Sequence, residues 1–167
     1  MPGSRLRVSF DANVLVAGIQ HPRWPHEVLR TALLDTFDLV LPQQVIDEAV
    51  KHLPEQQQTV LAWFLSEWQP VILPVPGADL VAANPNLVRS AKDIPIALAL
   101  LAAGVHIFVT NDRDFTDPGA TLEPFTSSVR VMLPAVFLRD IIGWSSEELE
   151  AIRHRTWGDM PPSVSPT

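Results

Sequence analysis

Five acidic residues occupy positions in the chain where carboxylates can take part in chemistry. Asp11 directly follows one short apolar run, and Asp112 and Asp114 follow another. Asp93 stands before an apolar helical pattern, and Glu48 lies beside the apolar stripe of an earlier one. Several carboxylates in one pocket repel one another at low dielectric, and a hard divalent cation relieves that repulsion. Mg²⁺ and Mn²⁺ prefer such oxygen ligands, so the combination indicates a candidate metal site.

Each of these acids also has an ordinary structural interpretation. An aspartate that follows a strand often forms a turn, which would account for Asp11, Asp112 and Asp114. Asp93 is placed to act as a helix N-cap, and Glu48 as a solvated helix residue. Function is therefore indicated by the ordered combination of the five acids and not by any one of them.

The acids must be positioned by an alternation of short β-rich runs and longer helical patterns. Strands are expected over residues 6–10, 37–41, 71–75, 105–109 and 129–132. Helices are expected over residues 25–34, 42–53, 55–68, 93–103, 134–142 and 145–157, the last with a capping box of Ser145 and Glu148. This alternation predicts an α/β fold, a three-layer α/β/α sandwich with a mainly parallel central sheet.

The carboxyl ends of the predicted strands are where a ligand site is expected, because open parallel sheets bind ligands there. Asp11 and Asp112 both fall at that edge, and their carboxylates lie close together if the two strands are neighbours. The residue types then support metal-assisted hydrolysis of a phosphodiester. In that chemistry a bound cation lowers the pKa of water and stabilises charge on the phosphate oxygens. It requires no Ser, Cys or His nucleophile.

The composition limits the classes of protein that fit. The 167 residues carry twelve basic and nineteen acidic side chains, and the net charge of −7 argues against binding nucleic acid by bulk charge. The chain has no cysteine, which excludes a disulfide scaffold, a Cys-ligated zinc site and a thiol nucleophile. The five histidines show no metal-site spacing, and His106, inside an apolar run, is expected in the core.

The length and the 47% of hydrophobic residues predict a single domain over residues 1–157. A disordered tail is expected over residues 158–167, which are rich in proline and serine. Residues 94–111 carry no charge, but Pro95 and Gly104 interrupt them, so a buried helix and a buried strand are expected there and not a membrane span. We expect a soluble, cytoplasmic protein without a membrane partner.

The ordered acids and their surroundings resemble the PIN-domain family, and specifically its bacterial toxin-like branch. The matching segments are residues 8–13 (VSFDAN), 42–53, 92–101, 109–115 (VTNDRDF) and 131–138. The resemblance covers roughly residues 6–142. Its most specific part is the run of residues 110–115 (TNDRDF) in its order relative to Asp11.

This resemblance implies a function and a set of site residues. Four residues match the family's acidic metal-binding quartet, namely Asp11, Glu48, Asp93 and Asp112. Asp114 matches a frequent fifth position, and Asn13 and Thr110 match polar residues that hold the site together. The implied protein is an Mg²⁺- or Mn²⁺-dependent endoribonuclease, the toxin of a pair whose partner antitoxin neutralises it. One departure lies in residues 87–92 (LVRSAK), where many relatives carry further acids; it bears on substrate binding and metal number.

Basic and aromatic residues suggest contacts with partners. Four basic residues in segments expected near the same edge are candidate phosphate contacts, namely Arg23, Arg89, Lys92 and Arg113. A solvated surface charge is an equally good interpretation of each. Trp63, Phe64 and Trp68 share one predicted helix, where they would form a homodimer surface or, as the favoured interpretation, part of the core.

Two other functions stay open at this point. One is a non-catalytic PIN-like module that binds RNA or a protein partner without cutting. The other is a different α/β enzyme with an acidic Mg²⁺ pocket, such as a phosphohydrolase or a phospho-acceptor domain. A dehalogenase-type phosphatase requires a second aspartate where this chain has Asn13, and a phospho-acceptor domain requires a lysine after a late strand, where this chain has none.

Overall fold

A computed structural model describes residues 5–161 of the chain, and residues 1–4 and 162–167 lie outside the described part. Five strands form one all-parallel sheet in the order β3-β2-β1-β4-β5. Their bounds are β1 (Arg7–Phe10), β2 (Asp38–Pro42), β3 (Val71–Leu73), β4 (Ile107–Val109) and β5 (Arg130–Met132). The predicted parallel sheet of an α/β fold is thus confirmed.

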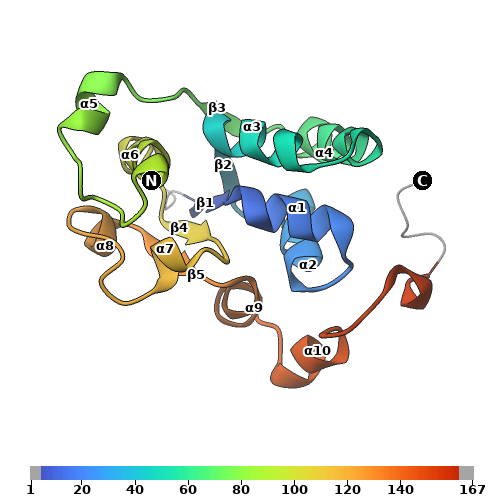
Figure 1. Cartoon of the computed structure of the whole chain (residues 1–167). Coiled ribbons are helices and arrows are strands. Elements are labelled where there is room, and N and C mark those ends of the chain that lie inside the picture. Colours follow the sequence, from blue (N-terminus) through green and yellow to red (C-terminus); the bar gives the residue numbers. More distant parts are fainter. Residues whose placement is uncertain (1–4, 162–167) are drawn as a thin grey trace.

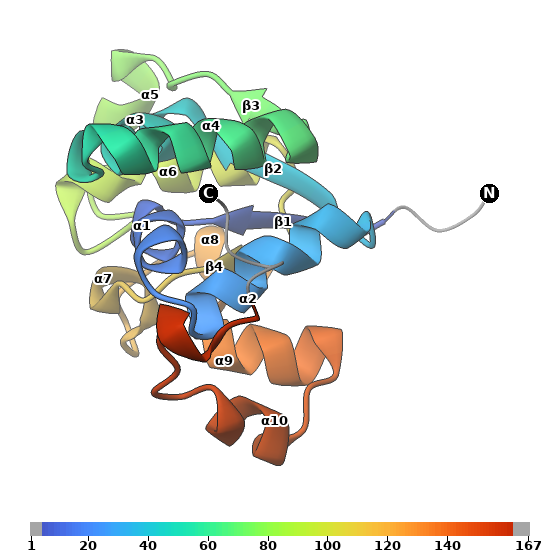
Figure 2. The same ribbon diagram turned by 90° about the vertical axis from the view of Figure 1, so that its right-hand side faces the viewer.

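Helices cover both faces of the sheet, which gives the predicted three layers. On one side lie α1 (Ala12–Gln20), α2 (Trp24–Thr31) and α4 (Glu55–Trp68), and on the other lie α6 (Ile94–Ala102) and α8 (Phe125–Ser128) (Figure 1). Figure 2 shows α1, α2 and α4 in front of the sheet and α6 behind it. The remaining α-helices of the described chain are α3 (Gln43–His52), α5 (Ala78–Ala82), α7 (Arg113–Thr116), α9 (Pro134–Phe137) and α10 (Ser146–Ala151).

The central strands β1 and β4 are mostly apolar and buried, because helices cover both faces of the sheet. Val8 and Phe10 of β1, and Phe108 and Val109 of β4, have no exposed surface. Parallel strands that are covered in this way form continuous hydrophobic runs, which is why the sequence predicts them. The equally apolar α6 is a nine-residue core helix. Within residues 5–161, no helix is both long and apolar enough to cross a membrane.

The chain adds strands to one side of β1 up to β3 and to the other side from β4 onward, so the strand order switches between β1 and β4. Strand β1 pairs with β2 on one side and with β4 on the other, where Phe10 lies opposite Val109. In open α/β sheets, ligands bind beyond the carboxyl ends of the strands at such a switch point. Asp11 and Thr110 directly follow this residue pair. The strands that precede Asp11 and Asp112 are therefore neighbours, which is the condition under which the two carboxylates come close together.

Residues 12–20 form a helix, α1, that the sequence pattern does not predict. The β-branched Val14 and Val16 and the helical Gly18 lower its intrinsic helix propensity, and it has no charged face. Burial of Val14 and Leu15 stabilises the helix instead, and the side chain of Asp11 caps its N-terminus. Tertiary contacts therefore override local propensity in the segment that follows the first acid.

The C-terminal segment differs from its predicted helix. α10 begins with the predicted capping box of Ser145 and Glu148, but it ends at Ala151 instead of continuing to residue 157. A 3₁₀ turn follows at Trp157–Asp159. The structure therefore describes the first four residues of the predicted tail, and its residues 162–167 lie outside the described part.

The structure tests the predicted core positions of His106 and of the three aromatic residues of α4. The core position of His106 is wrong: the residue is exposed at the amino end of β4, and its Nδ1 accepts a 2.9 Å hydrogen bond from the backbone N–H of Arg7. Of the α4 aromatics, Phe64 is buried and Trp68 is half-buried against the core. Trp63 is 48% exposed, so the core interpretation fails for this residue alone.

Candidate metal centre

Asp11 is held rigidly where β1 ends and α1 begins. The residue is only 4% exposed. Its Oδ1 accepts a 2.8 Å hydrogen bond from the backbone N–H of Ala12, as a helix cap does. Its Oδ2 accepts a 2.6 Å bond from the hydroxyl of Thr110 and a 3.2 Å bond from the amide of Asn13. These donors stabilise the ionised carboxylate and fix its orientation.

Asn13 and Thr110 connect the first acid to the loop that carries the later ones. The Oδ1 of Asn13 accepts a 3.0 Å hydrogen bond from the backbone N–H of Asn111. The hydroxyl oxygen of Thr110 accepts a 2.9 Å bond from the backbone N–H of Asp112. The two side chains therefore set the distance between the ends of β1 and β4, which agrees with a site-supporting role.

Asp93 lies at the start of α6 and is 3% exposed. It occupies the expected N-cap position, but its side chain makes no capping hydrogen bond among the described residues. Its Oδ2 is buried and has no hydrogen-bond partner in residues 5–161. Buried carboxylate oxygens are normally paired with a donor or a cation, so an unpaired one points to a missing ligand.

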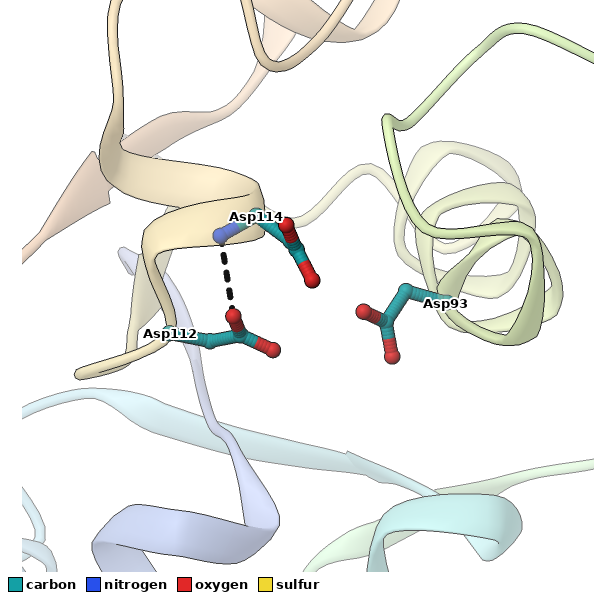
Figure 3. Close-up of side chains that lie close together, drawn as sticks. All are labelled: Asp93, Asp112 and Asp114. Carbon is teal, nitrogen blue, oxygen red and sulfur yellow. Dashed lines mark hydrogen bonds between the residues drawn. The ribbon is translucent and has the colours of Figure 1, made fainter.

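The carboxylates of Asp93, Asp112 and Asp114 face one another (Figure 3). Asp93 projects from the start of α6, and the other two come from the start of α7. The three offer oxygen atoms that all lie within 4.8 Å of one another. The Oδ1 of Asp112 accepts a 2.9 Å hydrogen bond from the backbone N–H of Asp114, which holds this short turn in place. Segments about twenty residues apart thus present their oxygens to one point.

The pKa values of the two buried acids reflect this crowding. Burial raises the pKa of Asp11 to about 6, although the hydrogen bond from Thr110 opposes the rise. Burial raises the pKa of Asp93 to about 7. Repulsion by the carboxylates of Asp112 and Glu48 raises both pKa values further. A cation at this place would favour the ionised forms of both groups.

A cavity of about 400 Å³ opens in front of the acids. Asp11, Asp93 and Asp112 line it from the sheet edge, and the half-buried Glu48 lines it from α3. The amide nitrogen of Gln44, one turn before Glu48, donates to the Glu48 carboxylate (3.4 Å) and to the Lys92 carbonyl (2.8 Å). The neighbouring acid Asp47 is exposed and is not among the residues that line the cavity, so Glu48 is the acid that α3 contributes.

The four basic candidates occupy different places. Lys92 is exposed and lines the cavity. Arg89 is paired with Asp114 at 2.8 Å and with Asp117 at 3.1 Å, so it holds the outermost acid of the cluster. Arg113 and Arg23 are not among the described residues that line the cavity. The first pairs with Asp117, and the second donates to the carbonyl of Arg155.

Other residues of the cavity are not singled out by the sequence. They are Ala12, Val16, Ala17 and Gln20 of α1, His21 directly after it, and His52 at the end of α3. The two histidines do not have the spacing of a known motif, and α1 itself is not predicted. The sequence therefore does not indicate that these residues line one cavity. The i, i+4 pair of Glu48 and His52 is the one signal that could have indicated it.

Comparison with known protein families finds no family model that matches the chain, and no curated protein matches it either.

The residues in place fit a hard divalent cation. The donor set around the acids consists of carboxylate oxygens, which suit Mg²⁺ or Mn²⁺ and not a soft metal. The buried Oδ2 of Asp93, which has no hydrogen-bond partner in the described part of the chain, would gain one. Asp11 contributes differently, because its Oδ2 already accepts two hydrogen bonds and its Oδ1 accepts one, so that one lone pair on Oδ1 is left for a cation.

Proposed function

We propose that the protein is a metal-dependent endoribonuclease that hydrolyses RNA phosphodiester bonds at the acidic cavity. The observation that carries the proposal is the carboxylate of Asp93, which faces Asp112 and Asp114. Its Oδ2 is buried and has no hydrogen-bond partner among residues 5–161. An acid kept in this state costs stability unless it serves a ligand. The order of the acids, which resembles that of the PIN-domain family, supports RNA as the substrate.

We assign each acid a role in catalysis from its position in the cavity. Asp93, Asp112 and Asp114 would hold an Mg²⁺ or Mn²⁺ ion, with Asp11 behind them. When bound, the cation would make hydroxide available near neutral pH and stabilise negative charge on the phosphate. Glu48 faces the same cavity from α3, where its carboxylate can orient the attacking water.

Thr110 and Asn13 would hold the acids in position. Thr110 and Asn13 fix Asp11 by donating to its Oδ2, and Thr110 also fixes the backbone of Asp112. Lys92, on the rim of the cavity, is placed to contact a phosphate oxygen of the substrate. This division of roles needs no side-chain nucleophile, in keeping with a cavity lined by acids.

The biological setting is proposed from the resemblance to the PIN-domain family. It consists of a toxin role, a cytoplasmic location and a partner antitoxin that blocks the cavity. A homodimer is a further proposal, for which the exposed ring of Trp63 on α4 offers an apolar contact.

The test is cleavage of an end-labelled RNA by purified protein in Mn²⁺ and in EDTA. The wild type is expected to cleave only in Mn²⁺. Asp11→Asn and Asp112→Asn are expected to lose at least about 10-fold in rate, the low end for removal of a group that supports a metal ligand. Asp47→Asn is the matched control, because Asp47 is an exposed acid outside the cavity lining. Unchanged cleavage by both site variants would refute the proposal. RNA binding without any cleavage would favour the non-catalytic module instead.

A further inference from the structure

The cavity continues beyond the acids as a groove along α1. Asn13, Val16, Ala17 and Gln20 recur at helical spacing and line it, and His21 follows at the end of the helix. The nine residues of α1 extend over about 14 Å at 1.5 Å per residue. One face of α1 therefore runs from the acids to a position well outside their coordination range.

The second wall of the groove is α3, which packs against α1. Figure 1 shows the two helices extending from the sheet in the same direction. Glu48 and His52 line the groove from α3 and are one helical turn apart. The Nδ1 of His52 lies 2.8 Å from the backbone carbonyl of Glu48, and a carbonyl can only accept, so Nδ1 carries a proton. This bond orients the ring and leaves Nε2 for a ligand.

The size of the cavity exceeds what a cation requires. An octahedral cation with six waters needs about 180 Å³, at roughly 30 Å³ for each water. The cavity measures about 400 Å³, so more than half of it is left over. The outer part is lined by the apolar Val16 and Ala17, the amide of Gln20 and the two imidazoles, which is a mixed lining suited to an organic ligand.

We propose that this α1–α3 groove binds the nucleotides of single-stranded RNA that flank the cleaved bond, with His21 and His52 as the outer subsite. The inference rests on the proposed ribonuclease function, which places the scissile phosphate at the acids. Imidazole rings stack on unpaired bases, and their N–H groups donate to phosphate or base oxygens. A single strand is the form that fits, because its bases are free to enter a groove between two helices.

The test compares the cleavage of two substrates, a 12-nucleotide RNA and a dinucleotide. The dinucleotide has one phosphodiester bond and no further nucleotides that could reach the outer subsite. The variant is His21→Ala/His52→Ala, and His154→Ala is the control, because His154 is exposed and outside the groove lining. The double variant is expected to raise KM for the 12-nucleotide RNA at least about fivefold, the low end for loss of one stacked base. Its KM for the dinucleotide should change much less than its KM for the 12-nucleotide RNA, because the dinucleotide does not reach the outer subsite. Fluorescence anisotropy in EDTA should show the same loss of affinity for the labelled 12-nucleotide RNA.

The outcomes separate the two proposals. A wild type that cleaves RNA, together with a double variant whose KM and affinity are unchanged, overturns the outer subsite and leaves the ribonuclease in place. An equal loss on both substrates also overturns it, because the imidazoles would then act at the acids. A wild type that cleaves neither substrate in Mn²⁺ overturns the ribonuclease and, with it, the subsite.

Discussion

The hydroxyl of Thr110 donates a 2.6 Å hydrogen bond to the Oδ2 of Asp11, across 99 residues of sequence. Both residues are almost completely buried, and each directly follows one of the two central strands. The bond joins the carboxyl ends of β1 and β4 at the point where the sheet order reverses. A single contact thus links the topology of the sheet to the geometry of the candidate metal centre.

Replacing Thr110 with valine tests this link. The variant keeps the shape of the side chain but removes a donor to Asp11 and an acceptor for the backbone N–H of Asp112. Because a hydrogen bond to a charged group contributes about 1.5–3 kcal/mol, the free energy of unfolding at pH 7.5 in EDTA should fall by about that amount. Thr110→Ser, which retains the hydroxyl, should lose much less. Urea denaturation measures both, and equal losses would contradict the hydrogen-bond explanation.

The raised pKa of Asp93 predicts a pH-dependent penalty on stability. The folded protein holds this proton up to about pH 7, whereas the unfolded chain releases it near pH 3.8. The folded state therefore binds more protons between these values, and stability falls as the pH rises through that window. In EDTA, Asp93→Asn should be more stable than the wild type at pH 8.

That stability gap should shrink by on the order of 2 kcal/mol as the pH is lowered from 8 to 5. The comparison is internal, so the buried His26, whose pKa is lowered by burial, contributes equally to both proteins and cancels. Thermal melting across this pH series measures the gap. A gap that stays constant with pH would show that Asp93 is not a buried acid with a raised pKa.

Gly18 allows α1 to pack closely against α2. A Cβ at this position would lie 2.7 Å from the Cδ1 of Leu29 and 2.9 Å from the backbone oxygen of Pro25. Alanine normally stabilises a helix relative to glycine, by about 1 kcal/mol, but here the clash should reverse the sign and destabilise the protein by about 1–3 kcal/mol. Gly77→Ala meets open space and should stay within about 0.5 kcal/mol of the wild type in urea denaturation.

The C-terminal segment is fastened to the α1–α2 hairpin by a buried ion pair. Arg155 donates to the carboxylate of Glu27 at 3.1 Å and to the carbonyl of Pro22 at 2.6 Å, and both ionic side chains are under 20% exposed. Arg155→Met leaves Glu27 with only Arg30 as a partner in the described chain, so a loss of about 2–4 kcal/mol is expected. Adding Glu27→Gln to that variant should recover part of the loss. A further loss of the same size would contradict the ion-pair account.

The sequence predicts the layers of the fold and the edge of the sheet at which Asp11 and Asp112 lie, because both depend on local patterns. Asp11 and Asp112 follow buried strands, and a parallel sheet puts the ends of its strands at one edge. The sequence leaves open which strands are neighbours, and the structure shows it in the pairing of Phe10 with Val109. The roles of the acids in catalysis stay a prediction.

What the sequence cannot predict depends on tertiary contacts. α1 contains weak helix formers and is stabilised by burial of its apolar face. The sequence therefore predicts neither the helix nor which of its residues line the groove. Arg89 looks like a free phosphate contact, but the fold pairs it with Asp114. His106 lies in an apolar run, yet β4 begins only at Ile107, and the ring of His106 is exposed and accepts a hydrogen bond from the backbone of Arg7.

The central claim is that acids from distant segments form one divalent-cation site, and metal-dependent melting tests it most directly. Wild type and Asp112→Asn are melted side by side in EDTA and in excess Mn²⁺. A site filled at 100 times its Kd adds about 2.7 kcal/mol, and each kcal/mol moves Tm by about 2–4 °C for a domain near this size. The account predicts a Tm increase of several degrees in the wild type that is lost or much reduced in the variant. An equal increase in both proteins, or none in the wild type, would contradict it.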